Sequence, residues 1–550
     1  MTDDAFQAYM SAAETGDVTT LRRLTNCYRR TTAAGTTALM AAASHGHLGA
    51  VSLLAPHEST MRDRRGYTAL MYSIEKGSME ILQCLSNEIN ISSDTGITAL
   101  EIAMQHRQYK LAETLYPLEQ AKAKVTPLMW ESFVGNVAAV HQYTQYAKCQ
   151  TSGGMTALMF AAIAGCTECV KALAKHEMKL RNNNGLTALM FAATYNCGGA
   201  VSLLLKEVGM RDNGFLTALM RASKKGSTDA INVLAKQEAQ YVDDNDNTAL
   251  IFAALSGTVA QSAALIPKIS SWTNAEGRTA LMIAARAGDL NGVKLLIPKE
   301  KGIQDNQGMT ALMFATQAGH LDVIKELMNY EAEMQSSTGK TALMFAVEAN
   351  CQEAVDLLIP KEACKQDNLG TTALMAATSL GLLSIATRLF PYEKLIVRKD
   401  GSTALMTALQ SDNTELVALC MEEAGLKTEF EDTALNMALQ LAFYKSAQLL
   451  MQSAKERELI GMTDLMVAAF CNDIEAVKRY TPTQKMMQDK QQRTALMYAA
   501  MKGNTGCISP LIDEGLLVDI NGWTADTYSA RYFHDAFTNT LCAALESRGK

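Results

Sequence analysis

Proline, aromatic side chains and net charge are all scarce in this chain of 550 residues. Nine prolines and 35 glycines exclude a collagen-like chain or one made mainly of linkers. Hydrophobic residues make up 48% and charged residues 19%, a balance that excludes extensive disorder. The formal net charge is −7 and the charges are dispersed, which is unlike the basic face of a nucleic-acid-binding protein. We therefore expect no nucleic-acid partner.

Long apolar runs are also missing. None reaches the roughly 18 residues that a membrane-spanning helix needs, so no membrane span is expected. The first residues, MTDDAFQAYM, lack the basic start and apolar stretch of a signal peptide. Twelve cysteines are then expected to be reduced thiols of a cytoplasmic protein. Association with the cytoskeleton is a further expectation, drawn by analogy only.

Signatures of catalysis and metal binding are missing as well. The chain has no G-x-S-x-G, no dinucleotide fingerprint and no set of kinase motifs. Cys166 and Cys169 form a lone CxxC, whereas a structural zinc site takes about four ligands. Ordinary thiols are the simpler interpretation of this pair, and a redox sensor is the alternative. We expect no catalytic residue, no metal and no cofactor.

What the chain does contain is one unit repeated end to end. Seventeen threonines each open a block that usually reads T-A-L-M, and the intervals between them are nearly all 30 or 31 residues, with one of 28. They are Thr37, Thr68, Thr98, Thr126, Thr156, Thr187, Thr217, Thr248, Thr279, Thr310, Thr341, Thr372, Thr403, Thr433, Thr463, Thr494 and Thr524. Residues 6–30 align as an eighteenth, incomplete unit. Nearly the whole chain is therefore one array of repeats.

Each block predicts two short helices joined by a tight turn. Counting from the threonine, apolar residues at +2 and +5 and again at +14 and +17 have helical spacing. The threonine is a helix N-cap, and Gly or Asn at +9 ends the first helix. Six of the nine prolines fall at +19, where they are expected to stop the second helix. Such helices are too short to be stable alone, so stacking on neighbours must hold them.

The block G-x-T-A-L-M-x-A-A-x-x-G-x-x-x-x-V-x-x-L, as in residues 154–173 and 308–327, resembles the ankyrin repeat. This chain has Ala for the usual proline in nearly every unit, with the proline retained at Pro127, and Met for the usual histidine in 13 units. The TALM variant is similar to the ankyrin-only arrays of some unicellular parasites. The resemblance implies an all-α solenoid of about 18 stacked helix-turn-helix units. It also implies a concave face of finger-like turns and first helices that binds other proteins.

Three irregular places divide the array. The units at Thr126 and Thr463 look like array starts, and the unit at Thr433 has Asn436 instead of Met and Ala442 instead of Gly. The predicted organisation is a capping repeat over 1–36 and repeats over 37–125, 126–462 and 463–550. The last range ends in a C-terminal cap, and seams are expected near 120–126 and 455–463.

Two residue types recur in a fixed register. Thirteen of the 31 methionines occupy +3, which favours a structural ladder over a binding face. Glutamate recurs at +21 in eight units, for example Glu58 and Glu331. Regular spacing over many layers favours a solvated or interlayer hydrogen-bonding role rather than acid–base catalysis.

The partner-binding residues are predicted from the family's pattern, in which residues just before the threonine and at the end of helix one line the groove. Four successive units carry an apolar residue before the threonine, and large side chains lie at nearby helix ends, which is typical of an interaction site. These residues are Val125, Met155, Leu186, Leu216, Phe133, Ile163, Thr194 and Tyr195. The alternative is that they pack on neighbouring fingers.

The function predicted is a non-enzymatic scaffold or adaptor that binds other proteins as a monomer. The alternative is a regulatory or substrate-targeting subunit of a kinase or ubiquitin ligase complex. No interval between threonines exceeds 31 residues, which leaves no room for a catalytic insertion.

Overall fold

The computed structural model describes residues 3–411 and 413–548. Residues 1, 2, 549 and 550 of the predicted terminal caps and residue 412 of the predicted middle block lie outside this range. The described residues are helical, and their only β-type pairings are three isolated bridges, such as that between Ser92 and Thr98. This confirms the all-α repeat class.

The chain divides into two compact units. One comprises Met1–Ala284 with Asn291–Glu300, and the other comprises Ala285–Leu290 with Lys301–Lys550. The predicted seams at 120–126 and 455–463 fall inside these units, and the domain boundaries stay a prediction.

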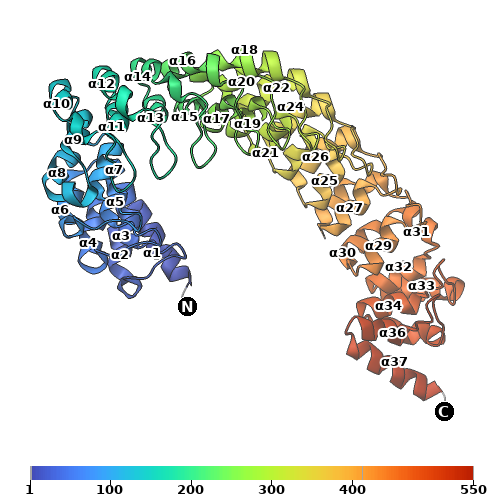
Figure 1. The fold of residues 1–550 in the computed structure, drawn as a ribbon. Coiled ribbons are helices and arrows are strands. Elements are labelled where there is room, and N and C mark those ends of the chain that lie inside the picture. Colours follow the sequence, from blue (N-terminus) through green and yellow to red (C-terminus); the bar gives the residue numbers. More distant parts are fainter. Residues whose placement is uncertain (1–2, 412, 549–550) are drawn as a thin grey trace. The chain divides into compact units, whose positions relative to one another are not determined.

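First helices form one row within each unit (Figure 1), and from the second repeat onward each begins directly after a repeat threonine. In the first unit they are α1 (Asp3–Thr15), α3 (Ala38–His45), α5 (Ala69–Ser73), α7 (Ala99–Gln105), α9 (Pro127–Val134), α11 (Ala157–Ala164), α13 (Ala188–Thr194), α15 (Ala218–Lys225) and α17 (Ala249–Leu255). α19 (Ala280–Ala287) contains the division at 284. The second unit has α21 (Ala311–Ala318), α23 (Ala342–Glu348), α25 (Ala373–Ser379), α27 (Ala404–Gln410), α29 (Ala434–Gln440), α32 (Asp464–Cys471), α34 (Ala495–Lys502) and α36 (Ala525–Arg531).

Second helices form the other row. They are α2 (Val18–Arg23), α4 (Leu48–Glu58), α6 (Met79–Cys84), α8 (Tyr109–Ala123), α10 (Val137–Gln142), α12 (Thr167–Glu177), α14 (Gly198–Leu203), α16 (Thr228–Glu238), α18 (Ile266–Ile269), α20 (Leu290–Glu300), α22 (Leu321–Glu331), α24 (Gln352–Glu362), α26 (Leu383–Glu393), α28 (Thr414–Leu419), α30 (Tyr444–Leu450), α33 (Ile474–Gln484), α35 (Ile508–Leu511) and α37 (Asp535–Arg548). One additional helix, α31 (Ala454–Ile460), follows α30. Short 3-10 turns are η1 (Thr25–Cys27), η2 (Ile74–Lys76), η3 (Ser86–Glu88), η4 (Thr144–Tyr146), η5 (Leu205–Glu207), η6 (Ala260–Leu265), η7 (Met421–Glu423), η8 (Thr505–Cys507) and η9 (Ile512–Glu514).

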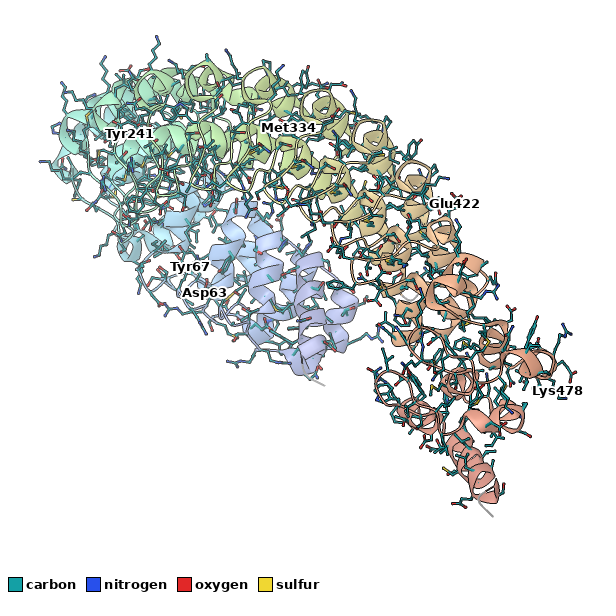
Figure 2. The ribbon with its side chains drawn as sticks, turned by 90° about the vertical axis from the view of Figure 1, so that its right-hand side faces the viewer. Asp63, Tyr67, Tyr241, Met334, Glu422 and Lys478 are labelled. Carbon is teal, nitrogen blue, oxygen red and sulfur yellow. The ribbon has the colours of Figure 1, made fainter. Side chains whose placement is uncertain are left out.

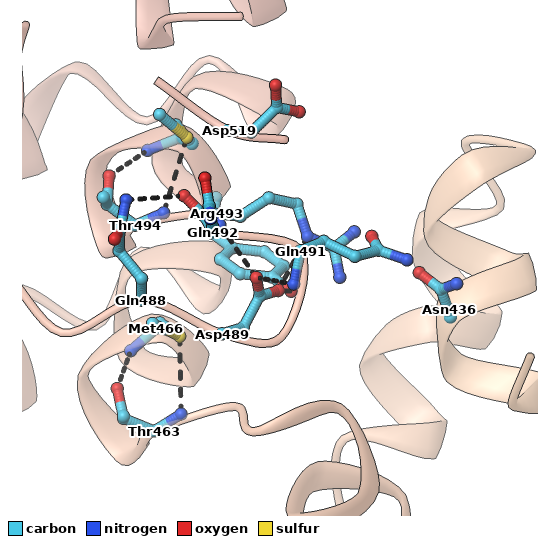
Figure 3. A network of polar contacts seen from close by, with 12 residues as sticks. Asn436, Thr463, Met466, Gln488, Asp489, Gln491, Gln492, Arg493, Thr494 and Asp519 are labelled. Atoms are coloured by element: carbon cyan, nitrogen blue, oxygen red, sulfur yellow. Dashed lines mark hydrogen bonds and ion pairs between the residues drawn. The ribbon is translucent and has the colours of Figure 1, made fainter. Parts of the chain in front are cut away.

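In many repeats the first helix is capped by the threonine and the methionine three residues later. The Thr494 hydroxyl accepts the backbone N–H of Met497 at 3.4 Å, and the Met497 sulfur lies 3.4 Å from the Thr494 backbone nitrogen (Figure 3). Thr463 and Met466 repeat this arrangement. All thirteen methionines at +3 are buried, which confirms that they form a structural ladder.

The proline prediction was wrong. Pro56, Pro117, Pro298, Pro360 and Pro391 lie inside second helices rather than beyond their ends. A proline in a helix leaves the carbonyl four residues earlier without its N–H donor. In α4 that carbonyl belongs to Ser52, which is exposed and can be hydrated. The helix then continues to Glu58, whose side chain must reach the interior.

The glutamates that end the second helices connect neighbouring repeats. Glu331 Oε2 accepts the N–H of Leu312 at 2.7 Å at the start of its own repeat's first helix, and Oε1 accepts the N–H of Gly302 at 3.0 Å from the preceding turn. We call such a residue a carboxylate rung. Thirteen rungs occur among the described residues. They are Glu58, Glu88, Glu119, Glu177, Glu207, Glu238, Glu300, Glu331, Glu362, Glu393, Glu423, Glu456 and Glu514.

The rungs confirm the interlayer role and exclude the solvated one, since all thirteen are buried. Burial raises the pKa of Glu331 above its usual value, while the N–H donors oppose the rise. The sequence pattern found only the eight at +21. The other five lie at +20 or +23, because their second helices end in a 3-10 turn or are followed by α31.

Candidate protein-binding surface and its two joints

Fingers are the turns formed by the five residues before each repeat threonine. Asp63 Oδ1 accepts the N–H groups of Arg65 at 2.9 Å and Tyr67 at 2.8 Å, and Figure 2 shows Asp63 and Tyr67 together on their finger. Asp305 and Asp519 hold their fingers in the same way. Each finger is thereby fixed from within, and its outer side chains are left to contact other molecules.

Four of the eight predicted partner-binding residues are buried. Met155 and Ile163 are fully covered and Phe133 almost so, and Val125 is 6% exposed. Phe133 stacks on Tyr109 with 4.7 Å between ring centroids. These four contact their own chain, as the packing alternative describes.

The other four predicted residues are half-buried. Leu186 and Leu216 lie at the ends of fingers, and Thr194 and Tyr195 lie at the end of α13. The Tyr195 hydroxyl donates to the backbone carbonyl of Gln105, ninety residues earlier. Their role in partner binding stays a prediction.

Tyr195 belongs to a place in the first unit where residues that are 56 and 90 positions apart in the chain contact one another. We call it the first joint, formed by Glu101, Gln105, Arg107, Gly153, Ile163, Tyr195 and Cys197. Arg107 Nε donates to the Ile163 carbonyl at 2.5 Å, and Nη2 lies 3.1 Å from Cys197 Sγ. The Arg107 guanidinium lies over the Tyr195 ring at 4.4 Å. The Arg107 side chain therefore connects the end of α11 to the end of α13.

Glu101 forms the other contact of the first joint. Its Oε2 accepts the N–H of Gly153, on the finger before α11, at 3.3 Å. Burial raises the pKa of Glu101 to about 7, against the lowering effect of hydrogen bonds from Thr151 and Gly153. The carboxyl therefore holds its proton to a higher pH than a solvated glutamate does.

A second joint lies in the second unit and is formed by Asn436, Gln440, Ala442, Tyr444, Gln491, Arg493, Met501, Trp523, Arg531 and Tyr532. The Tyr444 and Tyr532 rings meet edge to face with centroids 5.7 Å apart. Lys502 lies over the Tyr444 ring at 5.0 Å. A cavity of about 410 Å³ separates the end of α29 from the fingers and first helices of the last two repeats.

The two joints occupy equivalent positions. Glu101 and Asn436 are both at +3, and Arg107 and Ala442 are both at +9, where each has a left-handed backbone with φ of 57° and 60°. In each joint the first helix of one repeat meets residues of the second and third repeats after it. The repeat pattern predicted an irregular unit from Asn436 and Ala442, and Glu101 and Arg107 depart from the consensus at the same two positions.

The cysteine pair lies at the start of a second helix, and the choice between ordinary thiols and a redox sensor stays a prediction. Cys166 and Cys169 Sγ lie 2.8 Å apart at the start of α12, and burial raises the pKa of Cys169 to about 12. Within residues 3–411 and 413–548, no three His, Cys, Asp or Glu side chains are grouped to hold a metal ion. None of the helices described there has both the length and the apolar character to cross a bilayer.

The family model for ankyrin repeats (3 copies) matches residues 9–94, 57–127, 128–213, 259–338, 324–400 and 465–547. These ranges cover more than half of the chain, so the chain belongs to the ankyrin-repeat family. Ankyrin repeats are protein–protein interaction modules and are typically non-enzymatic. No curated protein matches the chain significantly.

Proposed function

We propose that this chain is a scaffold or adaptor that acts in the cytoplasm as a monomer. It binds other proteins through the face made by its fingers and the ends of its first helices, which is the concave face in the family. The part of the predicted groove around Leu186, Thr194 and Leu216 belongs to this face.

The observation that carries the proposal is the exposure of large apolar side chains on this face. Phe215, Leu369 and Phe430 are exposed on fingers, with 82% of Phe430 accessible. Exposed apolar residues also follow or end first helices; they are Val134, Leu255, Leu380, Leu441 and Phe533. Large apolar side chains in solvent mark interaction sites and carry binding energy once a partner covers them.

The test compares this face with the opposite row of helices. One full-length variant carries Phe215→Ser, Leu369→Ser and Phe430→Ser on fingers. Its matched control carries Leu48→Ser, Leu118→Ser and Leu295→Ser, which remove exposed apolar side chains from second helices. Circular dichroism confirms that both are folded, and proximity labelling in cells records neighbouring proteins.

We expect the finger variant to lose the proteins labelled by the natural chain and the control to keep them. Retention of every partner by the finger variant, or an equal loss in the control, would reject this face. Recovery of a kinase or ubiquitin ligase core among the finger-dependent partners would favour the targeting-subunit alternative.

A further inference from the structure

The cavity in the second joint has the lining of an anion-binding site. It is about 410 Å³ in volume, and its wall includes Gln440, Gln491, Arg493, Trp523, Arg531 and Tyr532. Two arginines but no aspartate or glutamate appear among the described lining residues. Volumes of this order are those of sites that take a side chain or a small ligand.

Arg493 carries an unused hydrogen-bond donor in this wall. Its side chain is 4% exposed, and its Nε donates to Asp489 Oδ2 at 2.7 Å (Figure 3). The buried Nη2 has no hydrogen-bond partner among the described residues. A buried guanidinium N–H without an acceptor is unfavourable, so an acceptor that a ligand brings to Nη2 by shifting this covered side chain would be stabilised there.

Arg531 supplies a second cation on a rigid support. Its guanidinium lies over the Trp523 ring at 4.6 Å and over the Tyr532 ring at 6.0 Å. None of the ion pairs among the described residues includes Arg531. Stacking on two rings holds the planar guanidinium in place while its N–H groups remain available.

The acidic groups behind the wall are already engaged. Asp489 accepts hydrogen bonds from Arg493 and from the Tyr498 hydroxyl, the latter at 2.8 Å. Asp519 accepts the Tyr528 hydroxyl at 2.6 Å and the Trp523 N–H at 2.9 Å. Neither carboxylate forms an ion pair with Arg531 among the described residues, although Asp519 keeps its negative charge because its hydrogen-bond donors are neutral.

We propose that this cavity binds a carboxylate presented by an acidic segment of a protein partner, with Arg493 and Arg531 donating to its oxygens. Gln440 and Gln491 supply neutral amides beside the carboxylate, and Trp523 and Tyr532 cover the apolar stem that carries it. Guanidinium pairs match the planar geometry of a carboxylate. The inference rests on the proposed function, because it gives the chemistry of one partner contact on the same face.

The test uses Trp523 as the reporter in the full chain. Trp130→Phe and Trp272→Phe leave Trp523 as the only tryptophan. Its fluorescence is titrated with acetyl-hexaglutamate amide and with acetyl-hexaglutamine amide. Acetyl-triglycine, as the free acid and as the amide, tests whether a chain end supplies the carboxylate as well as a side chain does.

Two arginine variants make the measurement specific. Arg531 is exposed, so Arg531→Gln is expected to fold. The control is Arg286→Gln, which removes an exposed arginine at the same +7 position of a repeat outside the cavity. We expect hexaglutamate to bind, hexaglutamine not to bind, and Arg531→Gln to weaken binding about tenfold or more. Arg286→Gln should leave binding unchanged.

Three results would overturn the inference. The two hexapeptides could bind equally, the two arginine variants could lose binding equally, or hexaglutamate and free acetyl-triglycine could both fail to bind. A phosphoserine peptide that binds where both carboxylates fail would replace carboxylate by phosphate and also overturn it. The finger variant tests the proposed function independently. Failure of the peptide with continued finger-dependent labelling removes only this inference.

Discussion

The first and second joints show how one arrangement of repeats gives a filled groove in one place and a cavity in another. In both, a repeat with a polar residue at +3 meets the second and third repeats after it. Arg107 of the first joint reaches the Ile163 carbonyl and the Tyr195 ring. Ala442, at the equivalent position, has no side chain long enough to do this, and the second joint keeps a cavity.

The difference shows that the side chain at +9 is one of several that distinguish the two joints, since Arg107 bonds to its own chain and Ala442 cannot. The left-handed backbone at +9 is the same in both joints, so the difference at this position lies in the side chain. In the first joint, the Ile163 carbonyl accepts a hydrogen bond from Arg107 of the same chain. The second joint instead presents arginines of its own, at Arg493 and Arg531.

The largest effect is expected where both joints share a feature. Glu119 and Glu456 are the carboxylate rungs of the repeats that enter the two joints, and each accepts two backbone N–H groups. Glu119→Ala or Glu456→Ala leaves one buried and one part-buried donor without its acceptor and should lower the free energy of unfolding by about 3 kcal/mol. Urea unfolding checks this, with Glu113→Ala and Glu458→Ala as exposed controls on the same helices. Equal effects of rung and control would contradict it.

Arg107→Ala should open the first joint. It removes a hydrogen bond to a carbonyl and a cation–π contact, for a loss of about 2 kcal/mol. Hydrogen exchange should quicken at residues 99–107 and at the ends of α11 and α13, and remain unchanged in the second unit. Arg181→Ala, in an exposed turn, is the control. Unchanged protection in Arg107→Ala would show that the arginine does not hold this joint.

Ala442→Glu should convert the second joint toward the first. A glutamate at this position, two residues beyond the lining residue Gln440, is expected to reach Arg493 or Arg531 and to stabilise the second unit by about 1 kcal/mol. Ala442→Arg places like charges together and should destabilise the unit by a similar amount. Thermal unfolding of the two variants gives the comparison. Equal midpoints would mean that the residue at +9 does not face the cavity.

The smallest effect concerns pH. Because burial raises the pKa of Glu101 to about 7, its stabilising contribution is complete below its unfolded value and is lost as pH rises through about 7. One proton changes stability by no more than about 1.4 kcal/mol per pH unit. After correction for the intrinsic rise of exchange rates with pH, protection at 151–153 should therefore fall between about pH 4.5 and pH 7 in the natural chain but not in Glu101→Gln. The second joint, with Asn436 there, should show no such dependence.

Much of the fold could be predicted because each repeat states it locally. Threonine caps, glycines at +9 and apolar spacing located the first helices, and the family model confirmed the class. The rungs at +20 and +23 could not be predicted from one fixed position of the repeat, because the length of the second helix varies. The joints escaped it for another reason. Arg107 meets partners 56 and 90 residues away, and that pairing depends on how the chain turns rather than on local pattern.

The distribution of rungs has a mechanical consequence. The repeats at Thr126, Thr248 and Thr463 have Tyr146, Ile269 and Gln484 where a rung would lie. The Gln484 side chain accepts only the N–H of Leu465, in its own repeat, among the described residues. In a linear array, opening spreads from layer to layer until it meets an interface with a different free energy. A repeat without a rung interrupts this spreading. Unfolding that starts on one side of it would stop there and leave the remaining repeats folded.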